Sequence, residues 1–248
     1  MDWNIHKLRA TFFHPHPVNI TESQWWEDVF GEIPESQVLK KRGQEKIENG
    51  NIDDIKAEIR IQPLRTDLYI ESIEKPIEDD NPLTSIGSFN DIDNIFLQYV
   101  FKWVNLNNFL QTNRIAFGAI LHQPVKDIIT GYKLLQSMLP AVKIDSKTSS
   151  DFLYQINRAR ISNVDIPGLK INRLTNWSVA TVKFLGLHVV ADIKQEDIFR
   201  KDFFACQLEL DINTSEDFTN ELPKEKIKDI FKELVSLGNE IGSEGDIA

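Results

Sequence analysis

The 248-residue sequence predicts an α+β fold of two layers, in which mainly antiparallel sheets carry helices on one face. Two kinds of pattern lead to this prediction. Apolar residues recur at three- and four-residue steps over residues 92–103, 128–139 and 227–237, as in helices that bury one side. Apolar and polar residues alternate over residues 55–62 and 204–212, as in strands with one buried face. Helices and strands of these kinds need each other's apolar faces to form a core.

The N-terminal region predicts one strand and one short helix. Residues 7–12 alternate between polar and apolar side chains, which indicates a strand. Thr21 and Gln24 have the spacing of a capping box, so we expect a short helix that ends at Gly31. The polar run over residues 37–51 predicts a solvated helix or a loop.

Residues 55–62 and 67–73 predict two strands that pair antiparallel around Pro63. The run of residues 74–85, which is rich in proline and acidic residues, predicts an exposed loop.

The central helix is expected to follow Ser88, whose hydroxyl can cap its first turn. A strand over residues 114–122 comes next, and we expect Pro124 to stop it. The order of elements to this point is that of a split βαβ, ferredoxin-like unit. One stripe of the central helix should be buried against the sheet, namely Ile92, Phe96, Tyr99 and Trp103.

The second half predicts a helix, three strands and a last helix that Gly238 closes, followed by a frayed tail. Because this order resembles the first half, we consider two ferredoxin-like halves, residues 1–122 and 123–248, beside one continuous domain. The expected elements are a helix from Asp127 to Pro140, strands over residues 152–161, 169–185 and 204–212, a turn at Pro167–Gly168, and a helix that opens at Pro223.

The composition indicates a cytoplasmic protein. Cys206 is the only cysteine, so the chain has no internal disulfide and no cysteine-based metal framework. No apolar run reaches the roughly 20 residues that a membrane helix needs, and the N-terminus does not resemble a signal peptide. No cofactor is predicted, because the glycines form neither of the common phosphate-binding patterns.

Charge is distributed unevenly along the chain, although the net charge is -10. Residues 101–187 carry 11 basic and 4 acidic side chains, whereas residues 188–248 carry 7 and 15. Such a basic segment can face nucleic acid or an acidic partner, or it can pair with the acidic segments beside it.

Histidines offer few candidates for catalysis. His14 and His16 are two apart, which suits two metal ligands on one strand face, but two ligands do not make a site, and we favour a polar turn after an edge strand. His122 and His188 are isolated, and general base catalysis needs a partner group. In the 55–62 strand, Glu58 and Arg60 faintly resemble a strand-borne nuclease motif, but a solvated strand face accounts for them.

A polar constellation in the basic segment suggests a binding surface without a catalytic set. Arg158 and Arg160 should project to one side of a strand, and the Pro167–Gly168 turn should bring Arg173 beside them. Guanidinium groups can bind carboxylates or phosphates of a partner, and we expect these three to contribute little to folding. The alternative is that they pair with acids of the protein itself. The candidate partner-binding residues here are Asn157, Arg158, Arg160, Asn172, Arg173 and Trp177.

Trp25 and Trp26 are further candidates for contact with a partner. Adjacent helix positions point about 100° apart, so we expect one ring in the core and the other near the surface. An exposed tryptophan favours a protein contact.

Three segments of the second half are similar to an uncharacterised, sporadically distributed bacterial family of about this length: Tyr154 to Arg158, Leu208 to Thr214 and the Ile227 to Leu237 helix. The resemblance covers about half of the chain, and the N-terminal third does not match. It implies an α+β protein encoded in mobile or defence-related surroundings, and it supplies no catalytic residues.

These patterns favour a non-enzymatic protein that binds another macromolecule, such as an antitoxin-like or accessory subunit that binds an effector or toxin of a bacterial defence complex. A nucleic-acid-binding protein that uses residues 101–187 is the alternative, and a metal-dependent hydrolase around His14 and His16 is a third hypothesis. No metal or membrane partner is expected.

Overall fold

The computed structural model describes residues 1–40, 44–73, 83–189 and 196–247. For residues 184–189 and 196–200 it describes the backbone alone. Its strands form one ten-stranded antiparallel sheet in the order β2-β3-β4-β5-β1-β6-β10-β9-β7, and β8 also pairs with β9. The strands are β1 (Asn4–Phe13), β2 (Ser36–Lys40), β3 (Glu45–Ile52), β4 (Ile55–Gln62), β5 (Arg65–Ser72), β6 (Arg114–Val125), β7 (Leu153–Asn157), β8 (Arg160–Ile161), β9 (Lys170–Val189) and β10 (Glu196–Thr214).

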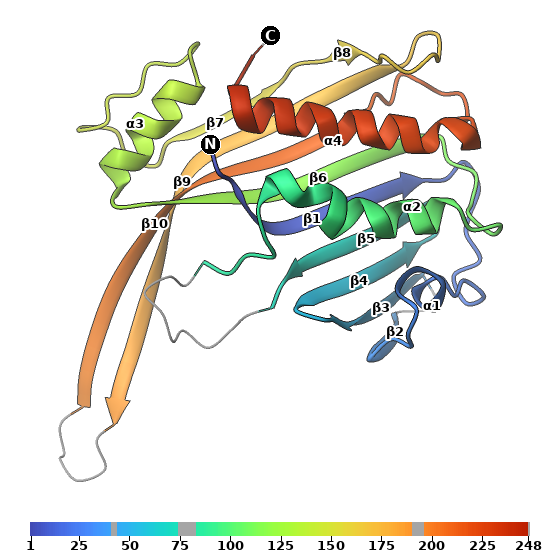
Figure 1. Ribbon diagram of the computed structural model, residues 1–248, viewed down its shortest axis with the longest axis horizontal. Coiled ribbons are helices and arrows are strands. Elements are labelled where there is room, and N and C mark those ends of the chain that lie inside the picture. The colour runs from blue at the N-terminus through green and yellow to red at the C-terminus, as the bar shows by residue number, and fades with distance from the viewer. Residues whose placement is uncertain (41–43, 74–82, 190–195, 248) are drawn as a thin grey trace.

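The helices lie together on one face of this sheet (Figure 1). The two-layer α+β class is therefore confirmed. No helix in the described ranges combines the length and apolar character needed to span a bilayer. The helices are α1 (Trp26–Phe30), α2 (Gln98–Val104), α3 (Ile128–Met138) and α4 (Ile227–Glu244), with shorter helical turns at Phe89–Asp91, Asp93–Leu97 and Lys224–Lys226.

The core lies between the sheet and the helices α2 and α4. Phe231 of α4 packs on Phe12 of β1 and Phe117 of β6, with ring centroids 6.2 and 6.1 Å apart. Trp103 of α2 meets Phe12 edge-on at 5.3 Å, and its side chain is fully buried. Aromatic contacts of this kind fix the helices over the central strands.

The central helix was predicted correctly in position but not in detail. The Ser88 hydroxyl accepts from the Asn90 amide, and the helix passes through a 3₁₀ turn and a π turn before α2. Ile92, Phe96 and Trp103 are buried as expected. Tyr99 is only half-buried, because it lies at the side of the stripe against Phe30 of α1, 5.1 Å away.

The prediction of a solvated helix or loop over residues 37–51 is wrong, because β2 and β3 occupy this segment. Lys46 and Glu48 of β3 point toward the helices, where they form a buried ion pair of 2.9 Å. Two buried charges in one strand gave that strand the appearance of a solvated segment. β2 lies at the edge of the sheet and all of its side chains are exposed. Its sequence therefore shows no alternation between polar and apolar residues.

The predicted capping box at Thr21 and Gln24 is also wrong. α1 begins at Trp26 without a side-chain cap, and the Thr21 hydroxyl binds Asn19 instead. Gly31 does end the helix in the left-handed conformation, with φ of 86°.

Pro124 and Gly238 do not end the strand and the helix that they were expected to end. Pro124 lies within β6 and does not end it. The pairing of β6 with β1 ends at His122, so the missing N–H of Pro124 costs no hydrogen bond to β1. Gly238 lies within α4, where a Cβ would come within 3.1 Å of Phe117 and 3.2 Å of Leu210. This glycine therefore permits close packing, and the chain after it is ordered: Asp246 is buried.

The predicted split βαβ unit is present in the first half. β5 and β6 both run antiparallel to β1, which lies between them, and α2 connects them across one face. The second half does not repeat this arrangement, because β10 and β9 separate β6 from β7, which runs antiparallel to β6. Residue 122, where the two halves were divided, falls inside β6. The loop predicted over residues 74–85 lies mostly outside the described residues.

Replacing Trp103 with alanine should lower the free energy of unfolding by about 3–5 kcal/mol, because a fully buried ring is removed from the core. Urea denaturation measures this change. Ile161→Ala, at a residue that is 74% exposed, is the control and should change stability by less than about 0.5 kcal/mol. Equal midpoints for the two variants would contradict the described packing.

Candidate functional site: the open face of the sheet

One face of the sheet carries no described helix, and we call it the open face. On β1 the residues that alternate with the core positions, Lys7, Arg9 and Phe13, project to this side. Their cross-strand neighbours continue the surface on β5 and β6. The residues of the open face used below are Lys7, Arg9 and Phe13 of β1, Lys56, Glu58 and Arg60 of β4, Arg65, Asp67, Tyr69 and Glu71 of β5, Gly118 and Ile120 of β6, Asn176 of β9, and Glu209 and Asp211 of β10.

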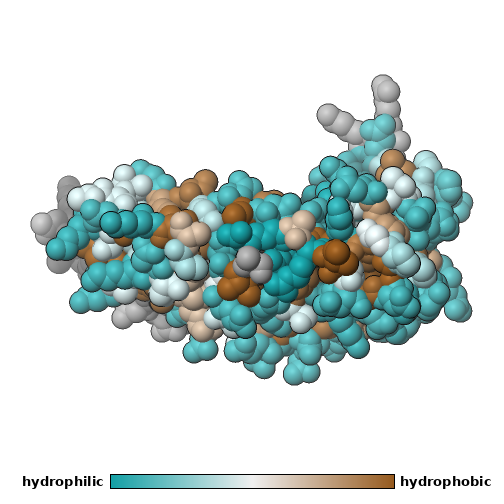
Figure 2. All heavy atoms as spheres, turned by 90° about the horizontal axis from the view of Figure 1, so that it is seen from above, coloured by the Kyte–Doolittle hydropathy of each residue, from teal (hydrophilic) through white to brown (hydrophobic). Residues whose placement is uncertain are grey.

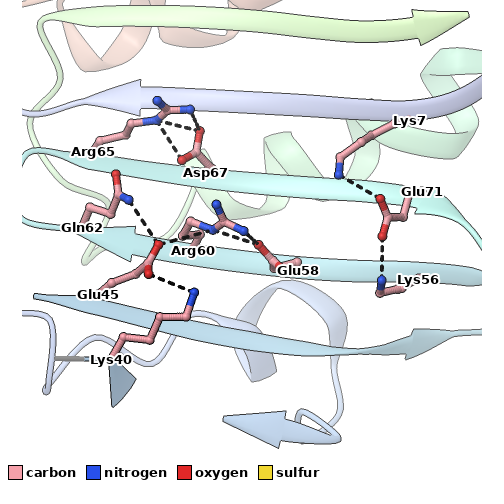
Figure 3. A network of polar contacts seen from close by, with 10 residues as sticks. All are labelled: Lys7, Lys40, Glu45, Lys56, Glu58, Arg60, Gln62, Arg65, Asp67 and Glu71. Carbon is pink, nitrogen blue, oxygen red and sulfur yellow. Dashed lines mark hydrogen bonds and ion pairs between the residues drawn. The ribbon is translucent and has the colours of Figure 1, made fainter. Parts of the chain in front are cut away.

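Charges of opposite sign alternate along one half of the open face (Figure 3). Glu71 accepts hydrogen bonds from Lys7 at 2.8 Å and from Lys56 at 2.7 Å. Burial alone raises the pKa of Glu71, but the bonds from Lys56 and Lys7 outweigh burial and leave the pKa lowered. Arg60 binds Glu58 through two nitrogens, at 3.0 and 2.7 Å. The cations in this half therefore already have acidic partners.

Two aromatic rings on the same face lie between cations. Lys7 and Arg60 approach the Tyr69 ring at 4.9 and 5.5 Å from its centroid. Arg65 and Arg114 approach the Phe13 ring at 5.6 and 5.2 Å. Both rings are half-buried, so they present a firm apolar surface within a charged one.

The open face is hollowed over Gly118, in a depression of about 300 Å³. Arg9 lies across Gly118, and its Nη2 reaches Asp211 Oδ2 at 3.3 Å. A Cβ at position 118 would come within 3.2 Å of Arg9 Nε, so the absence of a side chain there lets the guanidinium group lie close to the strand. Among the residues that line the hollow, Arg9 Nε and Asn176 Oδ1 are buried without a hydrogen-bond partner.

The sequence did not identify this hollow. The outward polar positions of the strands were visible in the alternation, but Arg9, Gly118 and Asp211 come together only through the register of β1, β6 and β10. A register between strands so distant in sequence has no local signal.

The three predicted arginines do come together, but on the opposite side of the sheet, against α4 and the C-terminal segment. Arg158 binds Asp246 bidentately at 2.6 and 2.8 Å, and Arg160 binds Glu240 at 3.0 and 2.8 Å. Arg173 is 2% exposed, and its Nε donates to the Arg158 carbonyl at 2.9 Å. Burial, together with the charge of Arg160, lowers the pKa of Arg173.

These contacts are those of the alternative in which the arginines pair with acids of the protein itself. The expectation that they contribute little to folding conflicts with the structure, because Asp246 would remain buried without its partner. The acids that neutralise the cluster come from α4 and beyond, far away in sequence. A role of the arginines in partner binding stays a prediction.

Asn157 and Asn172 lie on the open face, separated from the arginine side chains by the sheet itself. Asn157 donates to Asn172 at 3.3 Å, and Asn172 donates to Asn213 at 3.1 Å. The polar constellation is therefore not one patch, because successive strand residues point to opposite faces.

All three candidate tryptophans are buried, so the expected exposed ring is wrong. α1 packs between α2 and β3, which buries both of its neighbouring rings. Trp25 contacts Trp103 at 5.4 Å, and Trp26 lies over Gly50, where a Cβ would be 3.1 Å from the ring. Trp177 donates from Nε1 to the Thr175 hydroxyl at 3.0 Å and faces Trp3.

The histidines do not form the suggested metal site. β1 ends at Phe13, so His14 and His16 do not share a strand face: His14 is buried and His16 is exposed. The His14 ring binds the Gln111 carbonyl and the Thr66 hydroxyl. His122 stacks on His6 at 5.3 Å, and the side chain of His188 lies outside the described residues. In the described part of the chain, no group of three His, Cys, Asp or Glu side chains is placed to hold a metal.

The basic segment is partly neutralised within the fold. Its arginines 114, 158, 160 and 173 all contact side chains of the acidic C-terminal segment. The positive charges that the arginines contribute to the basic segment are therefore paired with the neighbouring acidic segment.

Comparisons of the chain with protein-family models, curated proteins and solved structures found no match. The similarity to an uncharacterised bacterial family accordingly stays a prediction.

Asp246→Asn should reduce stability above about pH 4, the ordinary range of an aspartate, and should have less effect in stronger acid. The Arg158 bond holds the pKa of Asp246 below its usual value, so its stabilisation is present above that value and is lost as pH falls through the lowered pKa. Urea unfolding of wild type and variant at several pH values measures the difference. Asp165→Asn, at an exposed position, is the control. A difference that does not change with pH would contradict the ion pair.

Proposed function

We propose that this protein is a non-enzymatic, cytoplasmic binding protein that holds another protein against its open face. The observation that carries the proposal is that the helices lie on one face of a ten-stranded sheet, while the other presents ordered charges and two half-buried rings. A surface of fixed charges and rigid aromatic rings supports specific recognition with little loss of side-chain entropy.

The distribution of charge favours a protein as the partner. Lys7, Arg60 and Arg65 each contact a carboxylate of the face, so few cations are left over for phosphates. An interleaved pattern of both signs is instead complementary to a similarly mixed protein surface.

Apolar side chains at the two edges of the sheet support the same partner class. Val38 and Leu39 on β2 are 44% and 55% exposed, and Leu153 on β7 is 63% exposed. On the side that carries β7, β8 and the C-terminus, hydrophilic residues cover most of the surface and hydrophobic residues gather in separate groups (Figure 2). Exposed apolar residues on edge strands are suited to contact with a second protein.

The proposed biological setting is that of an antitoxin-like or accessory subunit which binds an effector or toxin in a bacterial defence complex. This part of the proposal rests on the similarity of three segments in the second half to the uncharacterised bacterial family.

Single-stranded nucleic acid is a second candidate because of one observation. Tyr69 and Phe13 are rings on an open sheet face, each accompanied by two cations, and such rings can stack with bases while the cations contact phosphates.

Tyr69→Ser should weaken partner capture by about tenfold or more if the open face is the interface, because a rigid aromatic contact is lost. Full-length protein purified from its host, treated with nuclease and quantified for bound protein, measures this. Lys102→Ser, at an exposed position of α2, is the matched control and should capture as well as wild type.

Equal capture by both variants would exclude the open face. Loss of the captured material after nuclease treatment, with binding that falls steeply as salt rises, would favour the nucleic-acid candidate.

A further inference from the structure

The helix side of the molecule carries a groove between α2 and α4, which lie side by side (Figure 1). Two hollows, of about 570 and 370 Å³, follow one another along it. The first lies between residues 93–101 and 232–239, and the second lies between residues 104–105 and 224–228. Residue numbers rise along α2 where they fall along α4, so the two helices are antiparallel. We call this feature the α2–α4 groove, and its length is roughly 20 Å.

Three lysines line the α4 side of the α2–α4 groove at four-residue steps: Lys224, Lys228 and Lys232. The Nζ atoms of Lys228 and Lys232 lie 5.9 and 5.4 Å from the centroid of the Phe101 ring. Lys224 donates to the Leu106 carbonyl at 3.0 Å. Within the described residues, none of the three lysines forms an ion pair with a carboxylate.

The other clusters of cations in the fold are already neutralised. Lys7 and Lys56 share Glu71 on the open face, and Arg158 binds Asp246 on the helix side. Because the net charge is -10, most of the surface repels anions. Cations that have no acidic partner within the fold can attract an anionic group from outside it. The α2–α4 groove is therefore suited to an anionic partner.

The acidic residues that line the α2–α4 groove stand toward its two ends. Asp93 lies at the end of the first hollow, and Glu225 lies beside Lys224 in the second. The middle of the groove, around Lys228 and Lys232, is therefore its most cationic part.

The two sides of the α2–α4 groove differ in chemistry, which favours one class of anionic partner. Apart from Asp93, the α2 side is uncharged and consists of Leu97, Gln98, Phe101, Val104 and Asn105. The Phe101 ring is half-buried, so part of it remains open to a ligand. A phosphate backbone would find cations along the α4 side alone. A ligand that is acidic on one side and apolar on the other matches both sides of the groove.

The shape of the α2–α4 groove favours a helix as this ligand. Lys228 and Lys232 are one turn apart, or about 6 Å along the helix axis, which is also the spacing of acidic residues at positions i and i+4 of a helix. A pair of antiparallel helices offers a groove into which a third helix can pack. The first hollow also adjoins the π turn at Asp93–Leu97, and such turns are frequent at functional sites.

We propose that the α2–α4 groove binds an acidic amphipathic helix of a partner protein. Carboxylates of this helix lie along Lys228 and Lys232, and its apolar side rests on Phe101. The groove and the open face lie on opposite sides of the sheet. The inference therefore goes beyond the proposed function and does not depend on it.

Two fluorescein-labelled synthetic helices test the proposal on the purified full-length protein by fluorescence anisotropy. Both are about 18 residues long, which is enough to follow the groove, and both carry leucines on one side. The first has glutamates beside the leucines, and the second has glutamines in their place. The glutamate helix should bind at least about tenfold more tightly than the glutamine helix.

A labelled oligothymidylate of similar length is the third probe, and it should bind more weakly than the glutamate helix. Tighter binding of the oligothymidylate would show a phosphate site. Equal binding of the two helices would show that the lysines do not select the ligand. Either result, or no binding of the glutamate helix, overturns the proposal.

A double variant locates the site. Lys228→Gln with Lys232→Gln removes two charges and keeps the side chains long, so the affinity for the glutamate helix should fall at least about tenfold. The affinity for the glutamine helix should not fall. Lys133→Gln with Lys143→Gln is the matched control, because it removes the same charge from two exposed lysines outside the groove. This control should bind the glutamate helix as tightly as wild type.

Equal loss of affinity in the two double variants would show attraction to the overall charge of the protein and would overturn the proposal. Tyr69→Ser, on the open face, should bind the glutamate helix as tightly as wild type. Loss of binding in Tyr69→Ser would place the helix on the open face instead. The test of this groove is thereby separate from the test of the open face as an interface.

Discussion

The contact of Phe231 with Phe12 and Phe117 joins the last helix to the first strand and to the middle of the sheet. α2 packs beside α4, and its Trp103 meets the same Phe12 ring. Because this aromatic layer takes up one face of the sheet, the helices gather on that face. The opposite face is left to meet solvent or another molecule, which requires polar side chains at alternate positions.

The two faces handle charge in different ways. On the helix side, Arg158, Arg160 and Arg173 are held by Glu240 and Asp246, and they anchor the C-terminal segment over β7 and β9. On the open face, Lys7 and Lys56 reach Glu71 from the two neighbouring strands, and these ion pairs stay in contact with water. The first set secures the fold, whereas the second shapes a surface. Charge counted along the sequence does not separate these two uses.

Local patterns predicted the fold well wherever each element carried its own signal. The alternation in β4 and β10 and the stripes of the central and last helices were read correctly because one side chain in two, or one helix side, is buried. The pattern was misleading at β3, where the buried residues include the charged pair Lys46 and Glu48. The acidic partners of Arg158 and Arg160 were also missed, because they lie 88 and 80 residues away in sequence. The hollow at Gly118 depends on the register of three strands and could not be predicted.

The placement of β1 between β5 and β6 determines the order in which the sheet can form. As the chain is synthesised from its N-terminus, β1 has no partner until residues 65–71 exist, and none on its other side until residues 114–122 exist. β6 then waits for residues 204–213 of β10, and the aromatic layer is incomplete until α4 follows. Contacts so distant in sequence slow folding and leave strand edges exposed meanwhile. Chaperones or a slow rate of translation would therefore matter more for this chain than for a helical protein of its length.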